Sequence, residues 1–154
     1  MGDAEHEILI REALSLAYAA REKGDHPFGA VLAIGNRVLL SAENSVVSDG
    51  DPSRHAELNL IQLAWARLAK AEIESATLYA STEPCPMCTG AIYYSRVPRV
   101  VYSVSQTKLS ELTGGRFALP CIALLGRPER RTEVIGPVLP EEGYRVHVGF
   151  WPSP

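Results

Sequence analysis

Segments with helical periodicity alternate with short apolar segments along this chain. Residues 6–24 and 54–71 carry apolar side chains at helical spacing, whereas residues 76–81 and 99–104 are short apolar runs of strand length. A helix that connects two strands makes the chain cross one face of the sheet and cover it. The order therefore predicts an α/β protein, a three-layer α/β/α sandwich with a central mixed sheet of about five strands.

Further strands and a helix extend this pattern toward both ends of the chain. Residues 28–34 and 37–44 predict an antiparallel hairpin, because the Gly-Asn dipeptide between them suits a tight turn. Residues 132–139 predict a last strand at an edge of the sheet, since a Gly-Pro dipeptide interrupts it. Residues 140–151, which begin with proline, predict a closing helix.

Two further expectations concern loops and the packing of one helix. Residues 45–53 and 112–120 are rich in turn-forming residues and predict loops. In the helix expected over residues 54–71, four apolar side chains recur at helical spacing and predict the face that packs on the sheet: Leu58, Ile61, Trp65 and Leu68.

Composition limits the class of protein. The chain has 154 residues, of which 46% are hydrophobic and 21% charged, and this fits one globular domain over residues 1–154. No apolar run reaches the length of a membrane span, and the acidic N-terminus lacks the layout of a signal peptide. We therefore expect a cytoplasmic protein without membrane contact. The formal net charge of −3 argues against a nucleic-acid partner.

Two of the three cysteines, Cys85 and Cys88, lie one helical turn apart in the segment STEPCPMCTGAIYYSR. Such a pair at a helix start can be a redox couple, half of a structural zinc site or two small buried residues. A structural zinc site needs two more ligands, and the remaining cysteine, Cys121, is isolated and expected to be buried. A redox pair is expected directly after the first strand, which is not where this pair lies.

A histidine and a carboxylate upstream complete the pattern of a catalytic metal site. His55 and Glu57 begin one expected helix, as Cys85 and Cys88 begin the next. One histidine and two thiolates give Zn²⁺ three protein ligands and leave open a position in which the ion lowers the pKa of a water. Glu57 would carry the proton of that water to a leaving group. H-x-E followed by P-C-x-x-C is the signature of zinc deaminases, so we expect one zinc ion per subunit.

At these motifs the chain resembles the cytidine deaminase-like superfamily, in the branch of guanine deaminases, fungal-type cytosine deaminases and tRNA adenosine deaminases. The resemblance rests on HPFGAVL, DPSRHAE, STEPCPMCTGAIYYSR and the strand that follows, and covers about two-thirds of the chain. It implies that zinc is bound by His55, Cys85 and Cys88, and that Glu57 is the catalytic proton shuttle. It also implies contacts to a base from the Asn44 amide, the Ala56 backbone N–H, the Glu83 backbone carbonyl and the Phe28 ring.

The sequence favours a small substrate over a polynucleotide. From Arg127 onward four arginines are balanced by four glutamates, so the tail does not offer the basic surface that binds a folded RNA. HPFGAVL and EPCPMCTGAIYYSR resemble guanine deaminases more than fungal cytosine enzymes, so guanine is the expected base. Because the tail differs from that of guanine deaminases, the alternatives are cytosine, isocytosine, a pterin, an aminotriazine and tRNA adenosine. A zinc-stabilised binding module is a non-enzymatic alternative, and Glu57 argues against it.

The C-terminal tail contains acids and aromatic rings that could close a pocket. Glu142 could accept from paired N–H donors such as those of guanine, and Trp151 could shield the cavity from water. An amphipathic last helix is the favoured interpretation of each residue, with Glu142 in its first turn and Trp151 as a core anchor. Relatives in this branch are usually dimers, so the resemblance also implies a homodimer.

Overall fold

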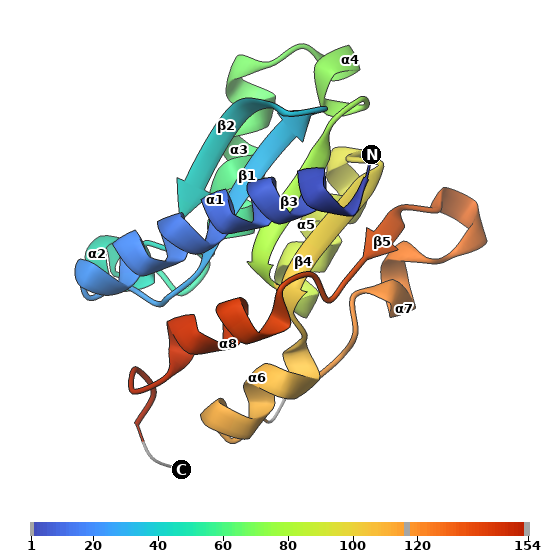
Figure 1. Cartoon of the computed structure of the whole chain (residues 1–154). Coiled ribbons are helices and arrows are strands. Elements are labelled where there is room, and N and C mark those ends of the chain that lie inside the picture. Colours follow the sequence, from blue (N-terminus) through green and yellow to red (C-terminus); the bar gives the residue numbers. More distant parts are fainter. Residues whose placement is uncertain (1, 116–117, 153–154) are drawn as a thin grey trace.

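Five strands form one mixed sheet in the computed structural model, which describes residues 2–115 and 118–152 (Figure 1). The strands are β1 (Gly29–Ile34), β2 (Arg37–Glu43), β3 (Thr77–Thr82), β4 (Arg99–Val104) and β5 (Glu133–Ile135). Their spatial order is β2-β1-β3-β4-β5. β1 pairs antiparallel with β2 and β3, whereas β3, β4 and β5 run parallel. The mixed sheet, the first hairpin and the edge position of the last strand are therefore confirmed.

Helices cover both faces of this sheet. α1 (Asp3–Glu22) and α8 (Pro140–His147) lie on one face, and α3 (Ala56–Arg67) and α5 (Pro86–Ser95) lie on the other (Figure 1). This arrangement confirms the predicted three-layer sandwich. Within the described ranges, no helix is both long and apolar enough to cross a membrane. The shorter helices are α2 (Val46–Asp49), α4 (Lys70–Ile73), α6 (Gln106–Thr113) and α7 (Ile122–Leu125), with a 3₁₀ turn at Pro128–Arg130.

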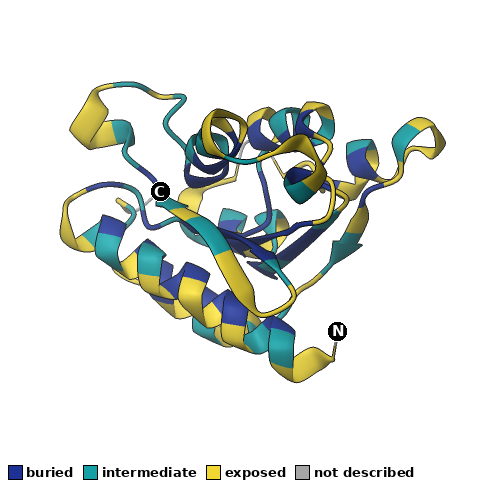
Figure 2. Ribbon diagram, turned by 90° about the horizontal axis from the view of Figure 1, so that it is seen from above, coloured by how far each residue is buried: buried dark blue, intermediate teal, exposed yellow. Residues whose placement is uncertain are grey.

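Alternate residues of the central strands pack into two separate apolar clusters. Leu32 and Leu78 join the cluster beneath α3 and α5. Their neighbours Val31 and Tyr79 join the cluster beneath α1 and α8. Successive side chains of a strand point to opposite faces, so strands buried on both faces are apolar throughout. Figure 2 shows the buried residues gathered along the sheet and on the inner sides of the helices.

The helix expected over residues 54–71 is shorter than predicted, and its buried face includes the predicted Ile61 but not Trp65. α3 ends at Arg67, where Leu68 has an extended backbone, and α4 follows after one further residue. Trp65 is 46% exposed, so the predicted face is wrong at this position. The prediction followed large side chains, whereas the buried face contains small ones that allow close approach to the sheet. The buried residues of α3 are Ala56, Glu57, Leu60, Ile61 and Ala64.

The two expected loops are more ordered than predicted. Residues 45–53 contain α2, because the Asp25 carboxylate accepts hydrogen bonds from the backbone N–H groups of Val47 and Ser48 in that turn. The segment 112–120 overlaps the end of α6 at Thr113. Residues 116–117 of this expected loop lie outside the described residues. The turn of α2 thus depends on a contact that local composition does not reveal.

Candidate metal centre and active site

Three potential metal ligands converge at the starts of two helices. His55 is the N-cap of α3, Cys85 is the N-cap of α5, and Cys88 follows in the first turn of α5. Pro86 occupies the first position of α5, where its missing N–H breaks no intrahelical hydrogen bond. The ligand atoms of the three side chains all lie within 4.8 Å of one another, and Cys85 Sγ is 3.4 Å from His55 Nδ1. The predicted ligands are therefore brought together.

This group fits a zinc ion. Two ligand atoms of one tetrahedral zinc lie about 3.3–3.8 Å apart, so the spacing requires little adjustment. Cys88 is buried, whereas His55 and Cys85 are half-buried, so a fourth ligand can approach from the side of these two. A hydrogen bond from the Cys88 thiol, with a further contribution from His55, lowers the pKa of Cys85 to about 4. The thiolate is the form of cysteine that binds metal.

Glu57 is buried close to these ligands. It is the second residue of α3, and only 6% of it is exposed. Burial raises the pKa of the Glu57 carboxyl to about 7, and the negative charge of Cys85 acts in the same direction. A carboxyl group whose pKa lies near neutrality can both take up and return a proton, which is what general acid–base chemistry requires.

Asn44 carries a buried donor without a partner. The residue is 1% exposed and its backbone N–H donates to the Phe28 carbonyl at 3.0 Å. Its Oδ1 accepts from the Val46 N–H at 3.0 Å, but its Nδ2 has no hydrogen-bond partner among the described residues. Leaving a buried donor unpaired is costly, so a carbonyl oxygen of a ligand would be stabilised there. Ala56, the buried first residue of α3, has a backbone N–H at a helix start, where intrahelical acceptors are lacking.

Aromatic rings of the HPF segment, residues 26–28, meet a ring of the C-terminal tail. The Trp151 ring centroid lies 6.0 Å from that of Phe28 and 5.4 Å from that of His26. Burial lowers the pKa of His26, and the charge of His55 acts in the same direction. Phe28 and Trp151, which the sequence singled out, therefore belong to one cluster. No sequence pattern indicates His26 as a member, because its ring contacts depend on the tail folding back.

The family follows from these residues and from their order in the chain. Residues 3–104 match the profile of the cytidine and deoxycytidylate deaminase zinc-binding region. The chain belongs to this deaminase family. His55, Cys85 and Cys88 lie within the matched residues, and they are placed to bind one metal ion.

Relatives of this deaminase act, by name, on different bases. A probable cytosine deaminase of Schizosaccharomyces pombe is 37% identical over 92% of this chain and 90% of the relative. A tRNA-specific adenosine deaminase of Bacillus subtilis is 37% identical over 88% of this chain and 82% of the relative. The solved structure of Bacillus subtilis guanine deaminase is 32% identical, with a TM-score of 0.65, and the match covers 85% of this chain and 83% of that one. The fold and the chemistry of the family are thus shared across several substrates.

Glu83 ties the metal-binding segment of the deaminase to α6 and α7. Its buried carboxylate accepts from the backbone N–H groups of Gln106 at 2.9 Å and Cys121 at 2.8 Å. The Gln106 side chain also donates to the Glu83 backbone carbonyl at 2.6 Å. A carbonyl has two lone pairs, so one is left for a ligand amine. Cys121 is buried, as expected, whereas no sequence pattern indicated Gln106, because its contacts depend on where α6 begins.

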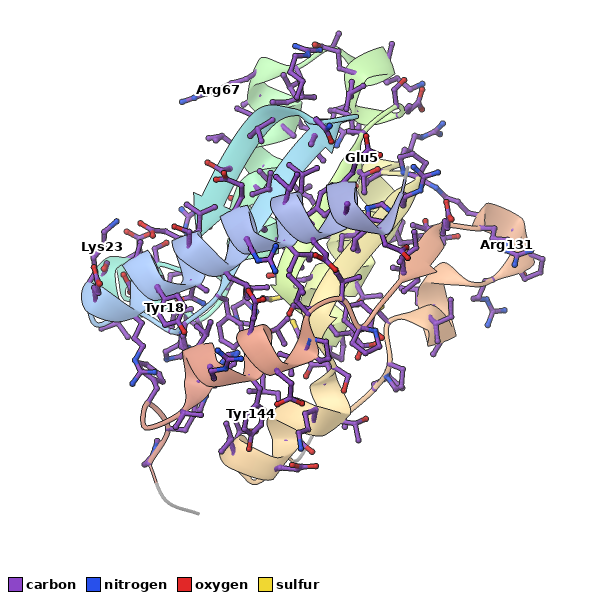
Figure 3. The ribbon with its side chains drawn as sticks, in the orientation of Figure 1. Glu5, Tyr18, Lys23, Arg67, Arg131 and Tyr144 are labelled. Carbon is purple, nitrogen blue, oxygen red and sulfur yellow. The ribbon has the colours of Figure 1, made fainter. Side chains whose placement is uncertain are left out.

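Glu142 lies in a different part of the deaminase from the aromatic cluster. Its carboxylate, on α8, accepts hydrogen bonds from Arg11 of α1 at 3.1 Å from Nε and 2.9 Å from Nη2. The pair lines a groove between α1 and α8 together with Tyr18, which Figure 3 shows on α1. Glu142 thus pairs with Arg11 of α1, and its contact with a substrate stays a prediction.

Proposed function

We propose that this protein is a zinc-dependent hydrolase that releases ammonia from a free nucleobase or a related small aminoheterocycle. The observation that carries the proposal is the group of His55, Cys85 and Cys88 with the buried carboxyl of Glu57 close to it. When bound there, zinc would supply a water activated for attack near neutral pH. A structural zinc site has four protein ligands and no need of a buried carboxyl, so the binding-module alternative is disfavoured.

The surrounding residues would bind the base and move its protons. Glu57 would take a proton from the attacking water and deliver it to a ring nitrogen and then to the departing amine. Asn44 Nδ2 would donate to a carbonyl oxygen of the base, which would satisfy its unpaired N–H groups. The remaining proposed contacts come from the Ala56 backbone N–H, the Glu83 backbone carbonyl and the rings of Phe28 and Trp151.

Cytosine is our first choice of base and guanine our second. The sequence motifs favour guanine, but Arg11 already engages the tail carboxylate that would have read the paired N–H donors of guanine, Glu142. The relative whose match extends over 92% of this chain is named a probable cytosine deaminase. A cytosine ring offers a carbonyl oxygen to Asn44 Nδ2 without needing a carboxylate reader.

Deamination of adenosine in tRNA is the second candidate function. The observation in its favour is the 37% identity to a tRNA-specific adenosine deaminase over 88% of this chain. The net charge of −3 argues against it, because phosphate backbones bind through clustered basic residues.

The test is ammonia release by the zinc-loaded protein from a panel of substrates, with Glu57→Gln as the blank. The panel contains cytosine, guanine, isocytosine, adenine, a pterin, an aminotriazine and an anticodon stem-loop. We expect turnover of one free base, with cytosine first. Activity on the stem-loop alone would contradict the free-base proposal in favour of the tRNA candidate. Silence on the whole panel would favour the binding module.

We also propose a cytoplasmic homodimer, formed through α5 and the segment around α7. The exposed fraction of Tyr94 is 80% and that of Ile122 is 51%, and burial of such apolar surface favours association. The thiols of Cys85, Cys88 and Cys121 are free, which fits a reducing compartment. Light scattering checks the mass, and a monomer at all concentrations would contradict the dimer.

A further inference from the structure

His147 joins the C-terminal tail to the strand that leads into the metal ligands. It is the last residue of α8 and is 1% exposed. Trp151 Nε1 donates to His147 Nδ1 at 3.2 Å, and His147 Nε2 lies 3.1 Å from Thr82 Oγ1. Thr82 is the last residue of β3 and precedes Cys85 by three positions. One buried imidazole therefore contacts both the tail and the segment that carries a metal ligand.

The chemistry of the three groups fixes the direction of these hydrogen bonds. An indole N–H can only donate, so His147 Nδ1 must be the acceptor. Burial, with a contribution from the positive charge of Arg21, lowers the pKa of His147 to about 4, so the ring is neutral near pH 7. Its single proton is therefore on Nε2, which donates to the Thr82 hydroxyl. The three side chains form one directed chain from Trp151 to Thr82.

Arg21 of α1 binds the same tail through backbone carbonyls at the end of α8. Its Nη1 donates to the carbonyls of Val146 at 2.7 Å and Val148 at 2.8 Å, and its guanidinium lies 5.7 Å from the Phe150 ring centroid. Carbonyls at a helix C-terminus lack intrahelical donors, so Arg21 caps α8. The end of α8 is thus fixed before the chain reaches Trp151.

The rings next to His147 are those proposed to line the base pocket. The His147 and Trp151 rings are nearly parallel, with an interplanar angle of 18° and centroids 6.1 Å apart. The Phe28 ring centroid lies 5.2 Å from that of His147. The imidazole thus supports both aromatic rings. A purely apolar side chain could fill this volume but could make neither hydrogen bond.

We infer that His147 is a positioning residue that fixes Trp151 over the base through its hydrogen bond to Thr82. The inference rests on the proposed deaminase function and deepens it. Strand β3 carries Thr82 at its end and leads directly to Cys85. The position of the aromatic cover is therefore set by the same segment that positions the metal ligand.

Matched variants separate the two hydrogen bonds of this chain. Thr82→Val keeps the shape of the side chain and removes the hydroxyl, whereas Thr82→Ser retains a hydroxyl. Trp151→Phe keeps an aromatic ring and removes the N–H donor. His147→Gln is the direct variant, and the changes at Thr82 and Trp151 test the inference if that variant does not fold. All variants are compared as zinc-loaded full-length chains.

The first readout is quenching of Trp151 fluorescence by acrylamide without added substrate. The chain has two tryptophans, so a Trp65→Phe background leaves Trp151 as the reporter. Trp65 is 46% exposed on α3, outside the proposed site. We expect stronger quenching in Thr82→Val than in Thr82→Ser or the parent. Equal quenching in the two Thr82 variants would overturn the inference. This readout stands even if no base is turned over, so its failure is distinct from a failure of the proposed function.

The second readout is the kinetics with whichever base the panel identifies. Thr82→Val and Trp151→Phe should each raise KM and lower kcat/KM by about tenfold, since small displacements of a positioned group are costly. Thr82→Ser should restore the parent values. The two hydrogen bonds meet at one imidazole. The Thr82→Val/Trp151→Phe double variant should therefore lose no more kcat/KM than the more impaired of the two single variants. Independent, additive losses would contradict the directed chain.

Discussion

At the scale of single residues, Glu57 connects the structure to the proposed chemistry most directly. An exposed glutamate is fully ionised near pH 7, whereas burial and the charge of Cys85 raise the pKa of Glu57 to about 7. The same residue is the glutamate of the H-x-E motif. Its place in the first turn of α3 keeps it close to His55. The buried position of Glu57 in the first turn of α3 thus accounts both for its raised pKa and for its place beside His55.

Replacing Glu57 with glutamine should separate metal binding from turnover. Glutamine keeps the shape of the side chain and cannot carry the proton, so we expect one zinc ion per chain and a loss of turnover of about 10²–10⁴-fold or more. Zinc content by atomic absorption and ammonia release are the two measurements. Glu22→Gln, an exposed change on α1, is the matched control and should leave both unchanged. Retained turnover in Glu57→Gln would contradict the proposed role.

Residues of the site differ in how far the sequence predicts them. His55, Cys85 and Cys88 could be predicted because they match the H-x-E and P-C-x-x-C signature, both halves of which lie at helix starts. The pairing of Glu142 with Arg11 could not be predicted, because the two residues are 131 positions apart. The same limit applies to His147, whose partner on β3 is 65 positions away.

At the scale of elements, α1 approaches β1 through a glycine. A Cβ at Gly29 would lie 2.3 Å from the Ala13 carbonyl oxygen and 2.8 Å from the Ala17 N, both backbone atoms that cannot move independently. Gly29 directly follows the HPF segment, whose His26 and Phe28 rings contact that of Trp151 in the C-terminal tail. The close contact between α1 and β1 at Gly29 thus lies next to the segment that carries two rings of the aromatic cluster.

Adding a methyl group at Gly29 should therefore destabilise the fold. We expect Gly29→Ala to lower the free energy of unfolding by about 1–3 kcal/mol, as overpacked cores do. Gly90→Ala is the control, since nothing lies within 4 Å of its Cβ position and alanine favours the helical state of α5 by about 1 kcal/mol. Urea unfolding of the zinc-loaded proteins gives both values, and an equal effect of the two changes would contradict the close packing at Gly29.

The order and type of the main helices and strands followed from the sequence. The buried face of α3 and the presence of the short helix α2 did not. The alternation of strands and helices is a local property, and it predicted the sandwich and the hairpin. The buried face of α3 includes Ala56 and Ala64, which a search for large apolar side chains misses. α2 forms because Asp25, distant in sequence, accepts from its backbone.

At the scale of the whole molecule, the topology brings the two halves of the metal motif together. β2 leads through α2 to His55, and β3, which runs antiparallel to the intervening β1, leads directly to Cys85. Strands β2 and β3 therefore run in the same direction, and their carboxyl ends lie on the same side of the sheet. Helix α8 then lies beside α1 (Figure 1), and the segment after it brings the Trp151 ring centroid to 5.4 Å from that of His26.

The most direct test of the central claim is a zinc titration of the chelator-treated protein, followed by ammonia release from the base that the panel identifies. The account predicts that activity rises with added zinc and reaches a plateau at one ion per chain. Cys88→Ala should show neither the rise nor the gain in thermal stability that accompanies it, because metal binding is coupled to folding. Full ammonia release by the metal-free chain would contradict the account.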